Sequence, residues 1–308
     1  MIRNLLQNLV VIFLLASCTT VSEPTEPFGA NKSSAVSVFD PVTMDLLTID
    51  AKHPPAFHEV AIPSHGALLT GFLLSANGPG PHATVVLMHG YPGNEKNLDI
   101  AQSMRRAGFN VLFFHYRGAW GSQGDYALNH LAEDVLSAID FLATNNKHFK
   151  VNTGKISLVG HSMGGFAALS AGAKSSLAKC VVGIAAANLG EYASRGEAAQ
   201  QGFKSYTDQL FMLNNFDGNK ALADIRLNQQ HYDVRAYGPH YKGKRVLLIA
   251  GEGDTVVPPA VQERIEQAWA ATPSLNLSTR TLPGDHAFSQ TRIVLQREVV
   301  SWLSQNCL

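Results

Sequence analysis

Several features that define other classes of protein are missing from this 308-residue sequence. Its 24 lysines and arginines equal its 24 acidic residues, and because no run of like charges occurs, we expect no nucleic-acid partner. None of its 12 histidines lies in an H-E-x-x-H motif or in a Cys/His spacing typical of zinc sites. Neither G-x-x-x-x-G-K-S/T nor G-x-G-x-x-G is present. The sequence therefore predicts neither a metal site nor a nucleotide site.

Cysteine is scarce, with three residues in the whole chain. Cys180 lies in a predicted strand, and Cys307 is one residue from the end. A disulfide between these two is possible in an exported protein, but a buried free thiol explains Cys180 equally well. The sequence leaves both alternatives open.

No apolar run is long enough to cross a bilayer, which takes roughly 20 residues. The run at 9–16 follows Arg3 and is interpreted as part of a signal peptide. It ends in the sequence L-A-S-C at 15–18, which resembles the lipobox of bacterial lipoproteins, where the signal is cut before a cysteine that then carries lipid. We expect a signal peptide over 1–17 and a lipid anchor at Cys18. The alternative is an ordinary signal peptide cut near Ser17, with an incidental cysteine.

Residues 19–32 are polar and contain prolines, as expected of a flexible tether between a membrane and a domain. Thr19, rather than aspartate, follows the cysteine, which resembles lipoproteins sent to an outer membrane. We therefore expect a tether and N-terminal extension over 18–55 and a folded domain over 56–308. The predicted location is the bacterial cell envelope, on the periplasmic face of the outer membrane.

From about residue 57, short β-branched runs alternate with longer helical patterns, which predicts βαβ units around a mostly parallel sheet. An antiparallel pair of strands is expected first, at 57–63 and 68–75. Further strands are predicted at 84–88, 110–115, 156–159, 180–185, 245–250 and 275–282, and helices at 94–107, 127–144, from 162, 259–270 and 288–303. The alternation stops between about 188 and 244, where aromatic residues are interspersed with polar ones. This stretch is interpreted as a helical insertion or small lid.

The segment Gly160-His161-Ser162-Met163-Gly164 matches G-x-S-x-G at the junction of an apolar strand and a helix. A strand that turns sharply into a helix needs glycine at the flanking positions, so that the turn closes and the helix packs on the strand. The start of the helix also places unpaired amide N–H groups beside the serine hydroxyl, where negative charge will develop. We predict Ser162 as a nucleophile.

A serine hydroxyl is a poor nucleophile unaided, so the hypothesis requires a histidine base and an acid that orients it. His286 is the only histidine after residue 250, and it lies in a loop directly after the predicted strand 275–282. Asp254, in the glycine-rich turn after the preceding strand, is the predicted acid. Glu252 and Asp285 are the alternatives for this role.

Attack on a carbonyl puts charge on an oxygen that needs hydrogen-bond donors already in place. The predicted donors are two backbone amides, that of Met163 directly after the nucleophile and that of Tyr91 in the loop 89–93. His89 in the same loop is expected to satisfy loop backbone rather than to act as the base.

These residues together resemble a known family. The run from about 85 to 288 resembles the α/β-hydrolase superfamily, and the motifs Y-R-G-A-W-G-S at 116–122 and G-D-T-V-V-P at 253–258 resemble its prolyl-oligopeptidase-like and serine-aminopeptidase-like members. The resemblance implies an α/β fold with a mostly parallel eight-stranded sheet flanked by helices, and a small helical insertion between the sixth and seventh strands. It also implies a Ser, Asp, His triad in that chain order and cofactor-free hydrolysis of esters, amides or thioesters. The large N-terminal propeller of oligopeptidases has no counterpart before the first predicted strand, which argues against gated peptidase activity.

The substrate has to be inferred from the loops and the insertion. Tyr91, Trp120, Phe211 and Met212 are candidates for lining an acyl pocket, with the alternative that aromatic residues of the insertion form a small core of their own. A lid of aromatic residues over Ser162 would suit an apolar acyl group. We therefore expect an enzyme that hydrolyses a small-molecule carboxylic ester. A peptidase or thioesterase is the first alternative, and a catalytically idle binding module of the envelope is an alternative of a different class.

Overall fold

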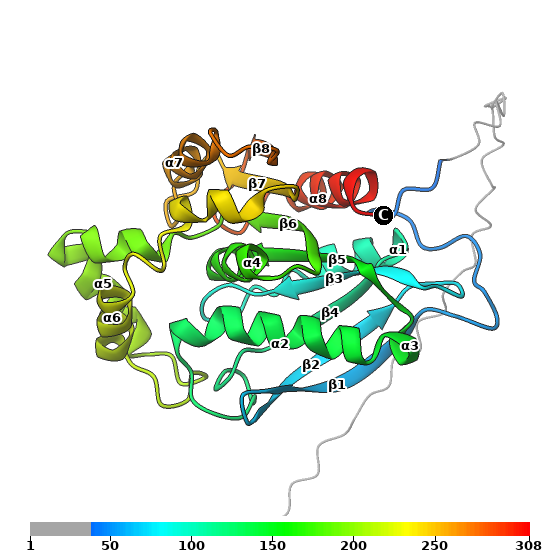
Figure 1. Cartoon of the computed structure of the whole chain (residues 1–308), viewed down its shortest axis with the longest axis horizontal. Helices are drawn as coiled ribbons and strands as arrows, with labels where there is room; N and C mark the ends of the chain where they lie inside the picture. Colours follow the sequence, from blue (N-terminus) through cyan, green and yellow to red (C-terminus); the bar gives the residue numbers. More distant parts are fainter. Residues whose placement is uncertain (1–37) are drawn as a thin grey trace, which may run out of the picture. The chain divides into compact units, whose positions relative to one another are not determined.

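The core of the fold is an eight-stranded sheet with the strand order β1-β2-β4-β3-β5-β6-β7-β8 (Figure 1). The structure is a computed structural model that describes residues 38–308. Strand β2 is antiparallel to both of its neighbours, and all other neighbouring pairs are parallel. The strands are β1 (Ala56–Ser64), β2 (Ala67–Ser75), β3 (His82–Met88), β4 (Asn110–Phe114), β5 (Val151–His161), β6 (Ala178–Ile184), β7 (Arg245–Gly251) and β8 (Asn276–Leu282). The expected mostly parallel eight-stranded sheet is confirmed.

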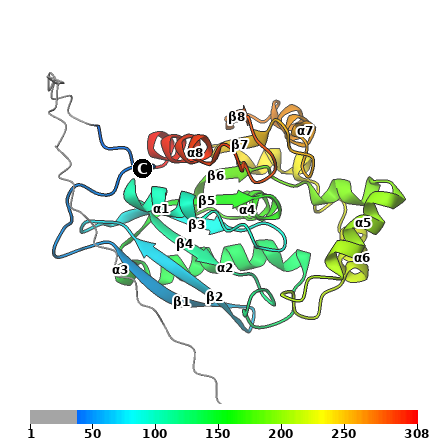
Figure 2. The ribbon, with the colours of Figure 1, turned by 180° about the vertical axis from the view of Figure 1, so that it is seen from behind.

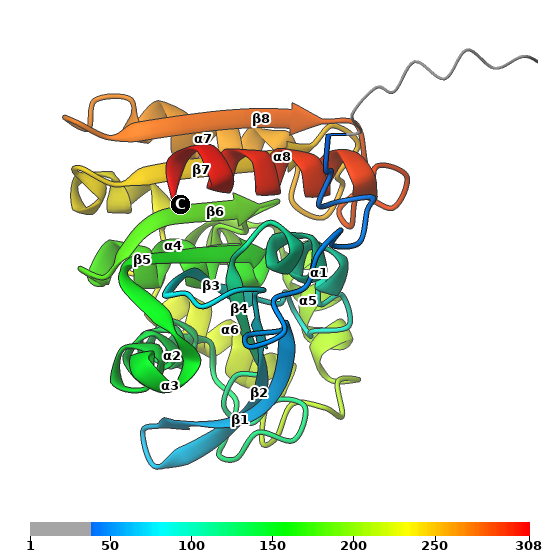
Figure 3. The same ribbon diagram turned by 90° about the vertical axis from the view of Figure 1, so that its right-hand side faces the viewer.

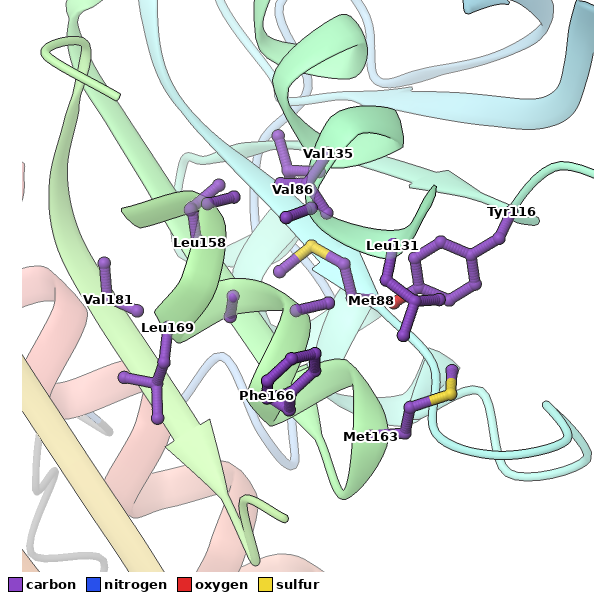
Figure 4. Packing of buried hydrophobic residues seen from close by; sticks show 14 of the residues in the cluster. Val86, Met88, Tyr116, Leu131, Val135, Leu158, Met163, Phe166, Leu169 and Val181 are labelled. Atoms are coloured by element: carbon purple, nitrogen blue, oxygen red, sulfur yellow. The ribbon is translucent and has the colours of Figure 1, made fainter. Parts of the chain in front are cut away.

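The two faces of the sheet are covered by different helices, and successive residues of a strand point to opposite faces. The helices α2 (Leu131–Thr144) and α4 (Met163–Lys174) cover one face (Figure 1), and Val86 and Met88 of β3 pack in the cluster beneath them (Figure 4). The same cluster includes Phe166 of α4 and side chains of α7 (Pro259–Trp269). Burial on both faces explains why the central strands are almost entirely apolar.

The other face of the sheet is covered by α1 (Leu98–Arg106) and α8 (Arg292–Asn306), which Figure 3 shows side by side. Val85 and Leu87 of β3 belong to this second cluster, together with Met104 of α1 and Leu303 of α8. The sheet therefore lies between two helical layers, as expected for the fold.

A disulfide joins Cys180 of β6 to Cys307 at the end of α8, with Cα atoms 6.2 Å apart. Of the two alternatives that the sequence leaves open, the structure contains the bridge and not the free thiol. The bond attaches the last helix to β6. Cys180 pairs with Arg245, the first residue of β7, so the attachment lies near the amino-terminal end of β6.

The insertion between β6 and β7 lies beyond the carboxyl ends of the parallel strands (Figure 2). It contains the 3₁₀ helices η2 (Leu189–Ser194) and η3 (Val234–Tyr241) and the α-helices α5 (Glu197–Thr207) and α6 (Gly218–Leu227). The helical insertion expected over 188–244 is thus present.

Some element boundaries differ from those predicted. The helix expected from 127 begins as the 3₁₀ turn η1 (Leu128–His130) before α2, and a short helix α3 (Asn146–Phe149) precedes β5. The helix expected from 288 begins only at Arg292, because Phe288 has a φ of 55° and therefore cannot belong to a right-handed helix.

One compact unit extends from Phe39 to Leu308, so the expected domain start at residue 56 lies inside it. Arg106 of α1 donates from Nε to the carbonyl of Pro41 at 2.6 Å, and Arg297 of α8 contacts Asp40 at 2.8 Å. The expected signal peptide, the lipidation site Cys18 and most of the expected tether lie outside the described residues. Within residues 38–308, no helix has both the length and the apolarity that a bilayer span needs.

Candidate active site

Ser162 occupies the turn between β5 and α4, with a φ of 58° and a ψ of −120°. Such a backbone conformation is strained for a residue with a side chain. The turn is possible because its neighbours are glycines: a Cβ at Gly164 would stand 2.5 Å from the carbonyl oxygens of Met88 and His89. At Gly160 it would collide with the carbonyl of Gly164. The sequence therefore forces the serine side chain out at the carboxyl end of β5.

The strand register brings the loops after five parallel strands to the same edge of the sheet. Met88 pairs with Gly160, and Gly160 pairs with Gly183, so β3, β5 and β6 end at one level. Asp254 follows β7 in the same way, and His286 follows β8. Since these strands are parallel, residues far apart in the sequence meet above their carboxyl ends.

Ser162, His286 and Asp254 form a continuous chain of hydrogen bonds. His286 Nδ1 lies 2.7 Å from Asp254 Oδ2, and His286 Nε2 lies 2.9 Å from Ser162 Oγ. A carboxylate only accepts hydrogen bonds, so Nδ1 carries the proton and donates a hydrogen bond to Asp254. Nε2 is then unprotonated and accepts from the Ser162 hydroxyl. This is the arrangement in which a histidine can take the proton of a serine as the serine attacks.

Asp254 is held in place by the backbone on its other side. Its Oδ1 accepts hydrogen bonds from the amides of Val256 at 2.8 Å and Val257 at 2.9 Å, and the residue is 3% exposed. Of the alternative acids, Asp285 accepts instead from the amide and the hydroxyl of Ser289. Glu252 is exposed on the surface. The structure therefore brings Asp254, and neither alternative, to the histidine.

The amides of Tyr91 and Met163 both lie at the carboxyl edge of the sheet, on the loops that follow β3 and β5. Within residues 38–308, neither amide donates to any other group of the protein. Two unpaired N–H groups at the edge that carries the serine are the kind of donors that a tetrahedral oxyanion requires. The side chain of Tyr91 donates to Thr207 Oγ1 of α5 at 3.0 Å, so this loop is also attached to the insertion.

His89, in the loop that follows β3, is fully buried. Its Nδ1 donates to the carbonyl of Gly90 at 2.8 Å, and its Nε2 accepts from His115 Nδ1 at 3.1 Å. Burial lowers the pKa of His89 to about 4, so the ring is neutral near pH 7. This agrees with the expectation that His89 supports the loop and is not the base.

A cavity of about 300 Å³ opens beside Ser162. It lies between the insertion and the carboxyl edge of the sheet where Ser162, His286 and Asp254 meet, which we call the catalytic edge. Its lining consists of Tyr91, Leu128, Ser162, Met163, Ala187, Leu189, Tyr192, Phe203, Tyr206, Val256, Val257 and His286. Within the described residues, no lysine, arginine, aspartate or glutamate lines this cavity, which we call the Ser162 pocket. A pocket of this composition fits an uncharged, apolar group.

The prediction that Trp120, Phe211 and Met212 line the acyl pocket was wrong. They surround a separate, more open hollow, and the side chain of Phe211 is 92% exposed. Trp120 supports the catalytic edge from outside, since its Nε1 donates to the carbonyl of Pro92 at 2.7 Å. Of the four candidates, only Tyr91 lines the Ser162 pocket.

Sequence reasoning missed the aromatic residues that do line this pocket. Phe203 and Tyr206 come from α5, and Tyr192 comes from η2. The rings of Phe203 and Tyr206 pack with that of Tyr91, with centroids 5.8 Å and 6.1 Å away, and the ring of Tyr192 packs with that of Phe203. The i, i+3 spacing of Phe203 and Tyr206 was a signal that both lie on one face of a helix. It did not indicate which part of the protein that face meets.

The sequence from 85 to 292 matches the family model described as the alpha/beta hydrolase family. Together with the sheet order and the serine at the turn after β5, this match shows that the chain belongs to the alpha/beta hydrolase family. The uncharacterized protein YfhR of Salmonella typhi is 26% identical over 312 residues, which cover 99% of this chain and 97% of that protein.

Solved structures of hydrolases share the fold. Est1E from Butyrivibrio proteoclasticus superposes with a TM-score of 0.61 at 20% identity, covering 80% of this chain and 98% of that one. The acylaminoacyl peptidase of Pyrococcus horikoshii gives a TM-score of 0.64 at 16% identity, covering 83% of this chain and 42% of that one. At these identities the likeness establishes the fold and leaves the substrate open.

Proposed function

We propose that this protein is a serine hydrolase that cleaves carboxylic esters through an acyl-enzyme on Ser162. The observation that carries the proposal is the hydrogen-bonded chain from Ser162 Oγ through His286 to Asp254. The unpaired amides of Tyr91 and Met163 add the donors that the reaction needs at the same edge of the sheet.

The proposed reaction has two halves. Ser162 Oγ attacks the ester carbonyl while His286 Nε2 takes the hydroxyl proton, and the amides of Tyr91 and Met163 donate to the oxyanion. Collapse of this intermediate breaks the bond to the leaving alcohol, which receives the proton from His286 and departs. A water molecule then attacks the acyl group with His286 again as base, releasing the acid and restoring Ser162. Asp254 keeps the imidazole in the required tautomer throughout.

The lining of the Ser162 pocket supports an ester with a neutral acyl group over an amino-terminal peptide. An α-ammonium group buried in this pocket would lack a carboxylate partner, and burying an unpaired charge is costly. The volume of about 300 Å³ corresponds to roughly ten water molecules at about 30 Å³ each, which suits an acyl group of medium length. A peptidase that acts on a blocked amino terminus remains the second candidate, because the fold is shared with an acylaminoacyl peptidase.

We also propose that the enzyme works at the bacterial cell envelope, anchored through a lipid on Cys18. Support comes from the apolar run and the L-A-S-C sequence. Expression in a Gram-negative host fed a labelled fatty acid tests this: the native chain should incorporate the label and a Cys18→Ala chain should not. Equal labelling of the two chains would exclude the anchor.

Ester hydrolysis by the full chain in detergent tests the proposed activity. Turnover of p-nitrophenyl esters from acetate to long acyl chains is measured beside the Ser162→Ala variant. We expect a rate that peaks at one chain length and is lost in the variant, with an unchanged unfolding temperature. Equal rates in both proteins would refute the role of Ser162, and inactivity of a folded native chain on every ester would favour the peptide candidate.

A further inference from the structure

The loop that carries His286 is fastened through two successive backbone carbonyls. The carbonyl of His286 itself accepts a hydrogen bond from His161 Nε2 at 2.7 Å. The next carbonyl, that of Ala287, accepts from Arg292 Nη1 at 2.9 Å. The main chain on the carboxyl side of the base is thus tied to the rest of the protein at both positions.

His161 is the residue directly before Ser162, at the end of β5. A carbonyl only accepts hydrogen bonds, so the imidazole of His161 carries its proton on Nε2, and its Nδ1 is unprotonated. That Nδ1 is buried and has no hydrogen-bond partner within residues 38–308. A buried polar atom without a partner is costly. The ring orientation that leaves Nδ1 unpaired is therefore explained by the hydrogen bond that Nε2 donates to the carbonyl of His286.

The environment of His161 keeps the ring uncharged. Burial, followed by the neighbouring His286 side chain, lowers the pKa of His161 to about 4. The ring centroids of His161 and His286 are 4.8 Å apart. Because His161 is neutral at the pH where His286 must accept a proton, it does not oppose the positive charge that forms on the base.

We propose that His161 is a positioning residue, which holds the main chain of His286 so that Nε2 stays within hydrogen-bond reach of Ser162 Oγ. The inference rests on the proposed function, because it needs His286 to act as the base. His161, which precedes the nucleophile in the sequence, thereby sets the distance between Ser162 and His286. These two residues are 124 positions apart in the chain. A displacement of about 1 Å between reacting groups can cost about 100-fold in rate.

Arg292 makes the second attachment but is a poorer test of the idea. Its guanidinium also contacts Asp99 through Nε at 2.9 Å and donates to Asn97 Oδ1 at 3.1 Å. It therefore joins the start of α8 to the start of α1, and its removal would alter helix packing as well as the loop. Within residues 38–308, the side chain of His161 makes a single hydrogen bond, so its substitution isolates the effect on the base.

The experiment compares the full native chain with His161→Phe, which keeps a flat ring without the donor, and His161→Gln, whose amide reaches the same carbonyl. One probe is a fluorophosphonate, which labels an activated serine whatever the natural ester. The other is kcat and KM on the best p-nitrophenyl ester. We expect labelling and kcat to fall about 10- to 100-fold in His161→Phe with KM unchanged. His161→Gln should recover most of the loss.

Native rates in His161→Phe would overturn the proposal, as would equal losses in the Phe and Gln variants. If the Phe variant does not fold, His161→Asn replaces it, since its shorter amide cannot reach the carbonyl; equal activity of the Asn and Gln variants would likewise overturn the proposal. Failure of the underlying function has a different signature: the native chain itself would not be labelled at Ser162.

Discussion

The catalytic edge of the sheet and the insertion above it are built in different ways. At the edge, the functional groups lie in loops that follow parallel strands, and Asp254 is fixed by the backbone amides of Val256 and Val257. In the insertion, short helices contribute aromatic rings to the Ser162 pocket, and α5 buries only Thr207 completely. On the proposed function, the sheet supplies the chemistry, and we expect the insertion to select the acyl group.

The largest effect is expected for Asp254→Asn at the catalytic edge. The amide can donate to Nδ1, which reverses the tautomer of His286 and removes the acceptor for the serine proton. In a triad, this change lowers kcat by about 10⁴. Steady-state kinetics should show this loss with KM unchanged, whereas Asp285→Asn, the matched control, keeps most of the activity. A small loss in Asp254→Asn together with a large one in Asp285→Asn would reverse the assignment of the acid.

Reduction of the disulfide should affect stability far more than chemistry. Cys180 and Cys307 lie 127 residues apart in the sequence, and loss of a native disulfide typically costs about 2–5 kcal/mol. Cys307→Ser should therefore lower the urea midpoint clearly while kcat on the best ester stays within the error of the native value. A fall in kcat at a temperature where the variant is folded would contradict the expectation that the disulfide, near the amino-terminal end of β6, does not influence the catalytic edge.

In the insertion, Phe203→Ala should change selectivity without abolishing activity. Removal of the ring enlarges the Ser162 pocket, so kcat/KM should rise for longer acyl chains and fall for the present optimum. One missing contact group of a hydrophobic pocket changes selectivity by about 10- to 200-fold. Phe211→Ala is the matched control, because that side chain is 92% exposed and lies outside the pocket. A shift of the chain-length profile in Phe211→Ala but not in Phe203→Ala would refute the proposed lining.

The smallest expected effect is a dependence of stability on pH. It should come from buried histidines at the catalytic edge and not from the insertion. Burial lowers the pKa of His89 and of His161 to about 4, compared with 6.5 for a free histidine. The unfolded chain therefore binds more protons than the folded chain between these values, and stability is lost as the pH falls from 6.5 to about 4. Urea midpoints at pH 7, 6, 5 and 4 measure this loss, which should be smaller in His161→Gln. An equal loss of stability in the native chain and in His161→Gln would contradict the contribution of His161 to this pH dependence.

Much of the catalytic edge could be predicted from the sequence because its signals are local. Ser162 stands between glycines at a strand-to-helix junction, and His286 and Asp254 each follow an apolar strand run. Parallel strands then bring these loops together without any further information. The mostly parallel sheet followed from the alternation of strands and helices, and the helical insertion followed from the place where that alternation stops.

The lining of the pocket could not be predicted, because an aromatic residue in an insertion carries no local sign of which surface it meets. Phe203 and Phe211 look alike in the sequence, yet the first lines the Ser162 pocket and the second is almost fully exposed. The bond from His161 to the carbonyl of His286 was equally hidden, since its partners are 125 residues apart. His161 stands at the second position of G-x-S-x-G, which accepts any residue, so the motif gives it no role.

The most direct test of the account is to look for the acyl-enzyme itself. The full chain is mixed with a p-nitrophenyl ester, quenched in acid within the first turnovers, digested, and analysed by mass spectrometry beside the Ser162→Ala variant. We predict the mass of the acyl group on the peptide that contains Ser162, and its absence from the variant. Ester hydrolysis without this adduct, or with an adduct on another residue, would contradict the assignment of Ser162 as the nucleophile.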